Sequence, residues 1–371
     1  MTLSTEQNEI VITKDSIRIV DNGKVKYDLP HLWLRDNCQC DECRVVESQE
    51  KRFMLSSIDS KLMPVNVEYD GEEIQLRWPD NHETIIDLSL IRELGRKRKP
   101  DWKTWGVNFK PSYFSWQEFI TNDSKAVNAI KEFISSGVII LSDAPREPET
   151  LELLSSRLGP LRETLFERIH NVSVSREVYN IAHTSLELPP HNDFASYTWP
   201  PSVQGLHMLE NECEGGESIV VDGWALLEKL RNDHPKHFQI LCEFGVPFRE
   251  FDENNETYAI EPMIKIDSNN IITGFRFSNQ LMQVIDPTRK KVKEFYLAYH
   301  ELCSRVLSTS FRSVFRLEGG QILLVAAHRV LHARQGFVPE GKRHLQDAYF
   351  EMDNIVNNIV VLRRRMASHD G

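Results

Sequence analysis

His191-Asn192-Asp193 is the segment on which the predicted fold and chemistry of this sequence depend. If it lies in a β-strand, His191 and Asp193 project from the same face, because side chains two residues apart in a strand share a face. They can then bind one metal ion as two members of a facial triad of two histidines and one carboxylate. Such a triad leaves three positions open and suits Fe(II) that binds an oxo acid and O₂ together. Alone the motif is weak, because a hydrogen-bonded surface pair has the same sequence.

The third ligand of such a triad is expected far along the chain, and residues 323–334 contain two histidines. His332 is favoured over His328, because two apolar residues precede it, as they would precede a ligand on a core strand. Arg343 follows His332 by eleven residues. A guanidinium group can bind a carboxylate through two parallel hydrogen bonds. The sequence therefore predicts an iron site completed by His332, with a carboxylate-binding Arg343 nearby.

A second possible metal site lies near the N-terminus, where Cys38, Cys40 and Cys43 fall within six residues. With His82 they would supply the three thiolates and one imidazole of a closed tetrahedral zinc site. A small β domain also gains stability from a bound metal. The alternative is three free thiols in a surface turn, which would be prone to oxidation.

The composition excludes several classes of function. A formal net charge of −11 argues against a general binder of nucleic acid or anionic membranes, since both need a basic surface. The short basic run at residues 96–99 is interpreted as part of a solvated linker. No apolar stretch approaches the length of a membrane span, and the polar N-terminus lacks the apolar core of a signal peptide. We therefore expect a cytoplasmic protein.

The pattern of strands and helices predicts a mainly β fold with peripheral helices, in two domains. Short β-branched runs separated by Asp, Asn and Gly turns fill the first hundred residues, and a charged stretch at residues 92–105 follows. We place the boundary there, which gives a small N-terminal β domain of residues 1–98 and a larger domain of residues 99–371. The larger domain should be a sandwich or barrel, because it has mostly strands and few helices. The predicted strands are 10–13, 16–20, 65–69, 74–78, 138–141, 271–277, 321–325 and 344–350, and the predicted helices are 115–136, 224–230 and 291–306.

These segments together resemble the gamma-butyrobetaine dioxygenase and trimethyllysine dioxygenase branch of the taurine dioxygenase-like superfamily, over nearly the whole chain. Residues 33–40 of the sequence WLRDNCQC, with Cys43 and His82, look like the zinc-binding domain of that branch. Residues 215–223, GGESIVVDG, look like the glycine-containing turn and strand that follow its His-x-Asp motif. Residues 329–332, RVLH, are similar to its distal histidine motif.

The resemblance implies a double-stranded β-helix (jelly-roll) core, Fe(II), 2-oxoglutarate, O₂, structural Zn(II) and often a homodimer. By position, Arg343 would bind the C5 carboxylate of 2-oxoglutarate, with Ser218 and Leu206 beside it. The implied reaction converts 2-oxoglutarate to succinate and hydroxylates an unactivated C–H bond. The protein would position that bond and exclude water.

The same resemblance implies a substrate pocket, but several of its residues depart from the pattern of the family. An aromatic cage for a trimethylammonium group maps to Phe166, His170, His183 and Tyr349. The two histidines stand where Tyr and Trp are expected, and a protonated His would repel a cation. Residues that would hold the substrate carboxylate map to Asn180, Asn279 and Phe194, the last in place of a Tyr.

The altered pocket leaves alternatives for the substrate. A quaternary ammonium compound of the gamma-butyrobetaine type is expected. Trimethyllysine, a trimethylammonium phosphonate, a sulfonate or another amino acid are the alternatives for the same reaction. A non-catalytic sensor of the same fold would have lost a metal ligand or the arginine, and the sequence retains them.

Overall fold

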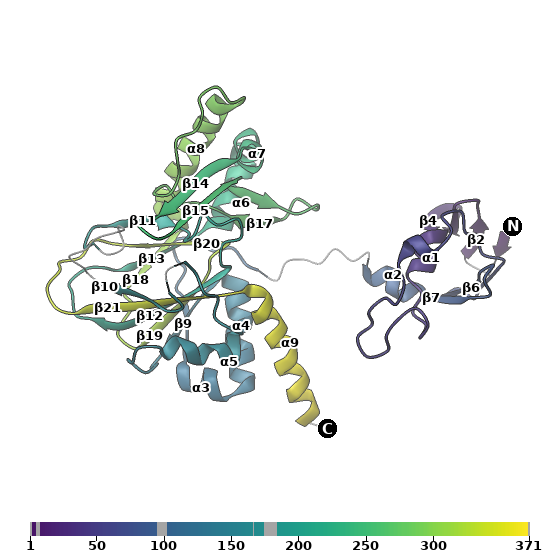
Figure 1. The fold of residues 1–371 in the computed structure, drawn as a ribbon, viewed down its shortest axis with the longest axis horizontal. Helices are drawn as coiled ribbons and strands as arrows, with labels where there is room; N and C mark the ends of the chain where they lie inside the picture. The colour runs from purple at the N-terminus through teal and green to yellow at the C-terminus, as the bar shows by residue number, and fades with distance from the viewer. Residues whose placement is uncertain (1, 5–7, 95–101, 166, 174–183, 370–371) are drawn as a thin grey trace. The chain divides into compact units, whose positions relative to one another are not determined.

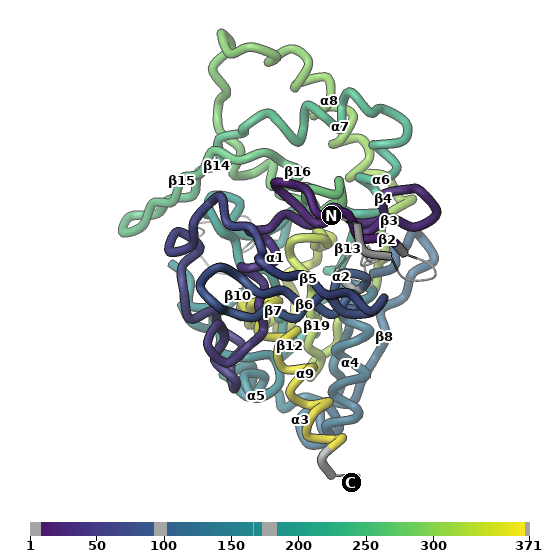
Figure 2. The backbone as a smooth tube through the Cα atoms, turned by 90° about the vertical axis from the view of Figure 1, so that its right-hand side faces the viewer, coloured from purple at the N-terminus to yellow at the C-terminus, as the bar shows by residue number. Residues whose placement is uncertain are grey.

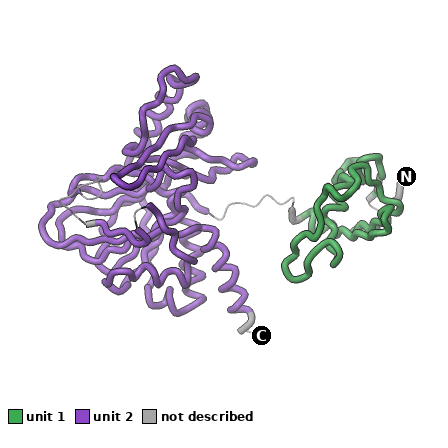
Figure 3. The backbone as a smooth tube through the Cα atoms, in the orientation of Figure 1, with its two compact units in different colours: residues 1–100 green, residues 101–371 purple. Residues whose placement is uncertain are grey.

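The computed structural model describes residues 2–4, 8–94, 102–165, 167–173 and 184–369. The chain divides into two compact units, Met1–Pro100 and Asp101–Gly371 (Figure 3). Each unit has its own hydrophobic core, and each is described here by itself.

Unit 1 contains two small antiparallel sheets. The first has the order β1-β2-β3-β4 and the second the order β5-β6-β7. Asn22 and Gly23 join β3 to β4 with positive φ angles of 50° and 76°, which a tight hairpin requires. The elements are β1 (Thr2–Ser4), β2 (Asn8–Ile12), β3 (Ser16–Asp21), β4 (Lys24–Pro30), α1 (His31–Asp36), η1 (Leu55–Ser57), β5 (Asn66–Tyr69), β6 (Glu73–Arg77), β7 (Glu83–Asp87) and α2 (Leu88–Leu94).

The two sheets of unit 1 share one core. Alternate residues of the strands are buried, as Ile74 and Leu76 are in β6, because successive side chains of a strand point to opposite faces. Trp78 is fully buried and donates its indole N–H to the Thr84 hydroxyl at 2.9 Å. The unit is small, so this core is modest and a bound metal would add to its stability.

Unit 2 is built on two facing sheets that form a jelly roll (Figure 1). The larger has the order β10-β21-β12-β19-β9-β8, and the smaller has the order β11-β20-β13-β18. All neighbouring pairs are antiparallel except β8 and β9. The strands are β8 (Ser112–Ser115), β9 (Val138–Ser142), β10 (His170–Ser173), β11 (Leu188–His191), β12 (Val203–Asn211), β13 (Ser218–Asp222), β18 (Arg312–Phe315), β19 (Gln321–Ala326), β20 (Val330–Arg334) and β21 (Arg343–Phe350).

Helices cover both outer sides of this sandwich. α4 (Asp123–Ser136) and α9 (Met352–His369) run along each other in both views (Figures 1 and 2) and share a core with the larger sheet. α7 and α8 pair at the other end of the unit. The further elements are α3 (Trp116–Thr121), η2 (Thr150–Leu154), α5 (Ser155–Leu158), α6 (Gly223–Asp233), α7 (Pro235–Glu243), β14 (Val246–Phe251), β15 (Glu256–Glu261), β16 (Ile264–Ile266), β17 (Ile272–Phe275), α8 (Val292–Leu307) and η4 (Thr309–Phe311).

Most of the predicted elements are confirmed, but the predicted helix at residues 115–136 is wrong in one respect. It is two helices, α3 and α4, because Asn122 leaves the helical conformation and caps α4 by accepting a hydrogen bond from the Lys125 amide. Gly137 ends α4 with a φ of 80°, as predicted. Among the described residues, none of the helices has the length and apolar character needed to cross a membrane.

Candidate active site

Three of the predicted site residues meet at one end of the sandwich. β11 and β20 are neighbours in the smaller sheet, and their ladder pairs His191 with His332. The His191 Nε2 atom lies 3.2 Å from Asp193 Oδ1, and the His332 Nε2 atom lies 3.8 Å from the same oxygen. One ligand atom from each residue falls within 4.8 Å of the others.

This geometry fits one transition-metal ion. Two ligands that are each about 2.1 Å from an ion, and at right angles to one another, lie about 3 Å apart. The second ring nitrogen of His191, Nδ1, lies 2.9 Å from the Pro189 carbonyl oxygen, which orients the ring with Nε2 towards Asp193. Burial lowers the pKa of His332 to about 4, so its ring is neutral and able to coordinate at neutral pH. His328, the rejected alternative, lies elsewhere, with its Nε2 atom 3.0 Å from the Pro200 carbonyl oxygen.

A buried hydrogen-bond network holds the other oxygen of Asp193. Oδ2 accepts from Gln204 Nε2 at 2.6 Å and from the Tyr349 hydroxyl at 2.8 Å. The same two groups also contact Asp347 Oδ2, at 3.0 Å and 2.6 Å. Because Oδ2 is occupied in this way, Oδ1 is left to face the two histidines.

The triad opens into a cavity of about 180 Å³ that is also lined by two arginines, Arg334 and Arg343. Both guanidinium groups lie over the ring of Phe337, at 4.9 Å and 5.1 Å from its centroid. Burial lowers the pKa of Arg343 from its usual value, and its Nε atom has no hydrogen-bond partner within the described part of the chain. Ser218 and Leu206 line the same cavity, as predicted for the 2-oxoglutarate end.

The Gly215-Gly216 turn lets the chain pass close to this arginine pair. Both glycines have positive φ angles, of 82° and 72°. A Cβ atom at Gly215 would lie 2.8 Å from the Gly336 carbonyl oxygen, and one at Gly216 would lie 3.3 Å from Cβ of Phe337. A larger residue would therefore displace the ring on which both guanidinium groups lie.

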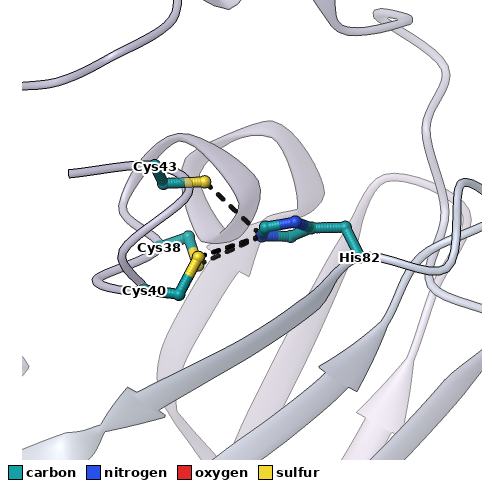
Figure 4. Close-up of side chains that lie close together, drawn as sticks. All are labelled: Cys38, Cys40, Cys43 and His82. Carbon is teal, nitrogen blue, oxygen red and sulfur yellow. Dashed lines mark hydrogen bonds between the residues drawn. The ribbon is translucent and has the colours of Figure 1, made fainter.

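The second predicted metal cluster also forms. The thiol sulfurs of Cys38, Cys40 and Cys43 lie 3.3, 3.7 and 3.4 Å from Nε2 of His82 (Figure 4). A tetrahedral zinc ion with sulfur at 2.3 Å and nitrogen at 2.0 Å would separate these atoms by about 3.5 Å. Glu42 Oε2 lies 3.3 Å from the other ring nitrogen, Nδ1, and orients the imidazole. The donor set and its spacing therefore fit a structural zinc ion.

Residues 95–349 match the model of the taurine catabolism dioxygenase TauD, TfdA family. The chain belongs to this family. Residues 10–86 match a second family, the N-terminal domain of gamma-butyrobetaine hydroxylase-like proteins. Together with the geometry of the cavity, this membership identifies the chain as an Fe(II)- and 2-oxoglutarate-dependent dioxygenase.

Relatives in this dioxygenase family are similar over most of their length. Gamma-butyrobetaine dioxygenase of Pseudomonas sp. (strain AK-1) is 29% identical over 346 residues, which are 90% of each chain. Gamma-butyrobetaine dioxygenase of Homo sapiens is 24% identical over 354 residues, 91% of this chain and 92% of the relative. Mitochondrial trimethyllysine dioxygenase of Bos taurus is 25% identical over 358 residues, 92% of this chain and 84% of the relative.

The predicted substrate residues are distributed unevenly. His170, Phe194 and Tyr349 line the cavity. The Tyr349 hydroxyl is engaged by the two aspartates of the network, while the Phe194 ring meets that of Tyr349 edge-on at 5.0 Å. Asn279 is exposed and accepts a hydrogen bond from the Tyr299 hydroxyl, whereas its neighbours Ser278 and Gln280 line the cavity. The remaining three predictions, Phe166, Asn180 and His183, lie outside the described residues.

His170 carries a partner that the sequence did not reveal. Its Nδ1 atom lies 3.3 Å from Asp347 Oδ1. Burial disfavours the charged ring, but the hydrogen bond and charge of Asp347 outweigh it and raise the pKa of His170 above its usual value. The positive charge that would repel a cationic substrate is therefore offset by the adjacent carboxylate.

Several residues of the cavity were missed from the sequence, and four of them are charged or belong to its hydrogen-bond network. Arg334 and Asp347 had a usable signal, because each lies two residues from a predicted site residue of the same strand and so faces the same way. Gln204 had the same signal, because it lies two residues before Leu206 on β12. Glu250 had none, since β14 contains no other predicted site residue.

Proposed function

We propose that this dioxygenase hydroxylates an unactivated C–H bond of a small quaternary ammonium compound of the gamma-butyrobetaine type. The observation that carries the reaction is one cavity that holds His191, Asp193 and His332 together with the half-buried Arg343. The names of the relatives support the substrate class.

In this proposal, His191, Asp193 and His332 hold Fe(II) through Nε2, Oδ1 and Nε2. The iron, when bound, supplies the oxidising chemistry with O₂ and 2-oxoglutarate, which becomes succinate. Gln204 and Tyr349 keep the Asp193 carboxylate in a single orientation by binding its outer oxygen.

The arginine end of the cavity would bind the co-substrate. Arg343 can grip the C5 carboxylate of 2-oxoglutarate through two parallel hydrogen bonds, with the Ser218 hydroxyl as a further donor. Arg334 adds a second positive charge, and its guanidinium is held by the Thr184 and Leu186 carbonyl oxygens. Leu206 and Leu345 form an apolar wall that excludes water from the reacting atoms.

A direct test measures succinate release with Fe(II), O₂ and 2-oxoglutarate against a panel of compounds. Gamma-butyrobetaine and related trimethylammonium acids should raise 2-oxoglutarate turnover well above the rate without substrate. The panel includes trimethyllysine, a trimethylammonium phosphonate, a sulfonate and ordinary amino acids as the alternatives. If only these raise the turnover, the butyrobetaine-type substrate is wrong; if nothing consumes 2-oxoglutarate, the catalytic proposal itself is wrong.

We also propose that Cys38, Cys40, Cys43 and His82 hold one structural zinc ion, which makes unit 1 a zinc-binding domain of about residues 1–98. The inter-atomic spacing described above supports this. Metal analysis of the purified protein should give one zinc per chain in addition to iron. A homodimer and a cytoplasmic location remain predictions, and sedimentation of the purified protein tests the first.

A further inference from the structure

We propose that Glu250 recognises the cationic group of the substrate, so that this enzyme selects its substrate by a carboxylate in addition to aromatic contacts. The inference rests on the proposed function and deepens it. Glu250 belongs to β14, which is part of neither jelly-roll sheet, yet it lines the cavity that holds the iron triad.

The charges of the cavity are separated along its length. Within the described lining, the lysine and arginine side chains are Arg334 and Arg343 alone. Asp347 follows Arg343 by four residues on β21 and faces the same side, about 13 Å along the strand at 3.3 Å per residue. Asp193 and Glu250 add carboxylates to the lining. The two negative charges of 2-oxoglutarate match the two arginines. The carboxylates of the lining are therefore left to interact with a positive charge on the substrate.

Of these carboxylates, Glu250 lies outside the network of Gln204 and Tyr349, although the Ser196 side chain hydrogen-bonds to its carboxyl. Asp193 is a ligand in the triad, and Asp347 accepts hydrogen bonds from Tyr349 and Gln204. The Oε2 atom of Glu250 is closed off from solvent and has no hydrogen-bond partner among the described residues, whereas the other such carboxylate oxygen of the cavity, Asp347 Oδ1, faces His170 Nδ1 at 3.3 Å. A carboxylate oxygen buried in this way costs free energy, which a bound cation would recover.

The electrostatic surroundings of Glu250 favour a cation over an anion. Burial and, to a smaller extent, the negative charge of Asp193 raise the pKa of the Glu250 carboxyl to about 7. A positive group beside Glu250 would reverse both effects, whereas a substrate carboxylate placed there would add repulsion. A trimethylammonium group has no N–H to donate, so its attraction to Glu250 would be through charge alone.

The test compares gamma-butyrobetaine with 5,5-dimethylhexanoate, which has the same shape but a carbon atom in place of the charged nitrogen. Calorimetry measures the Kd of each for the enzyme loaded with Fe(II) and 2-oxoglutarate in the absence of O₂. A second pair, 5-aminovalerate and hexanoate, extends the comparison to an amine with N–H groups. The variants are Glu250→Gln, which removes the charge but keeps the shape, and Glu253→Gln. Glu253 is exposed in the turn of the same hairpin and serves as the matched control.

All four compounds carry a carboxylate, and the two members of a pair differ in whether the other end is cationic or neutral. In the wild type the member with the cationic end should bind more tightly than the member with the neutral end. Glu250→Gln should weaken binding of the member with the cationic end by at least about tenfold and leave the other within about threefold, as expected for the loss of one charge partner in a partly desolvated site. Glu253→Gln should change neither. The affinity for 2-oxoglutarate should be the same in all three proteins.

The proposal is overturned if Glu250→Gln leaves the ratio of the two Kd values unchanged, or if the wild type binds neither member of either pair or prefers the neutral one. If Glu250→Gln binds both members of a pair more tightly, Glu250 lies beside the substrate carboxylate and repels it, which also overturns the proposal. If the cations bind in a Glu250-dependent way but none of them is hydroxylated, charge recognition stands and the proposed substrate of the reaction is wrong.

Discussion

Replacing Arg343 tests the proposed 2-oxoglutarate site most directly. Its side chain is half-buried in the cavity, and its guanidinium lies over Phe337. A bidentate contact with a carboxylate contains two charge-assisted hydrogen bonds, worth about 1.5–3 kcal/mol each. Arg334 remains in the cavity of an Arg343→Met variant and would keep part of the attraction. We therefore expect a loss at the lower end, about 3 kcal/mol, which weakens 2-oxoglutarate binding roughly 100-fold.

The affinity of an Arg343→Lys variant for 2-oxoglutarate should fall between those of the wild type and Arg343→Met, because lysine keeps the charge but lacks the planar guanidinium. We expect a loss of roughly tenfold. Lys342→Met is the matched control, since its side chain is 72% exposed and pairs with Glu210 outside the cavity. Calorimetry with Fe(II) in the absence of O₂ gives the Kd of 2-oxoglutarate for each protein.

Arg343→Met also distinguishes a role of Arg343 in binding from a role in the stability of the fold. Burial lowers the pKa of Arg343, which means that the folded protein disfavours its charge when no ligand is present. Arg343→Met should therefore not lower the melting temperature of the 2-oxoglutarate-free protein. An Arg343→Met protein that binds 2-oxoglutarate within threefold of the wild type would refute the assignment, and one that melts much earlier would show that the arginine supports the fold.

Four further perturbations probe other parts of the molecule. Asp193→Ala should abolish iron-dependent succinate formation, and normal 2-oxoglutarate consumption by this variant would refute the iron site. Tyr349→Phe should weaken iron binding roughly 10–100-fold, measured by iron titration, since it removes one hydrogen-bond donor to the Asp193 carboxylate. Cys40→Ser should lose one zinc per chain by metal analysis and lower the unfolding temperature of unit 1, whereas Cys303→Ser, outside the cluster, should do neither. Burial and the neighbouring His344 lower the pKa of His207 to about 4. The stability that a neutral His207 contributes is therefore fully present above pH about 6.5 and falls as the pH drops towards 4, by up to about 1.4 kcal/mol per pH unit. A His207→Leu variant that shows the same pH dependence of urea unfolding would contradict this.

The metal sites could be predicted because their ligands lie close together in sequence or in motifs of regular spacing. His191 and Asp193 were paired by the period of a β-strand; β11 in fact ends at His191 and Asp193 follows in a turn, yet their ligand atoms still meet. Cys38, Cys40 and Cys43 lie in one loop. In both sites, the distant residues His332 and His82 could be chosen because few histidines had suitable neighbours. Turn residues such as Gly137 marked element ends for a local steric reason that needs no tertiary contact.

The tertiary structure alone decided the electrostatics of the substrate cavity. Asp347 reaches His170 through the pairing of β10 with β21, and Gln204 reaches Asp193 from a different sheet. Glu250 enters the cavity from a hairpin outside the jelly roll. Periodicity within one strand carries no information on which strands will be neighbours. The sequence by itself therefore determined the family and the residues of the two candidate metal clusters, whereas strand pairing and long-range packing decided which charges line the cavity.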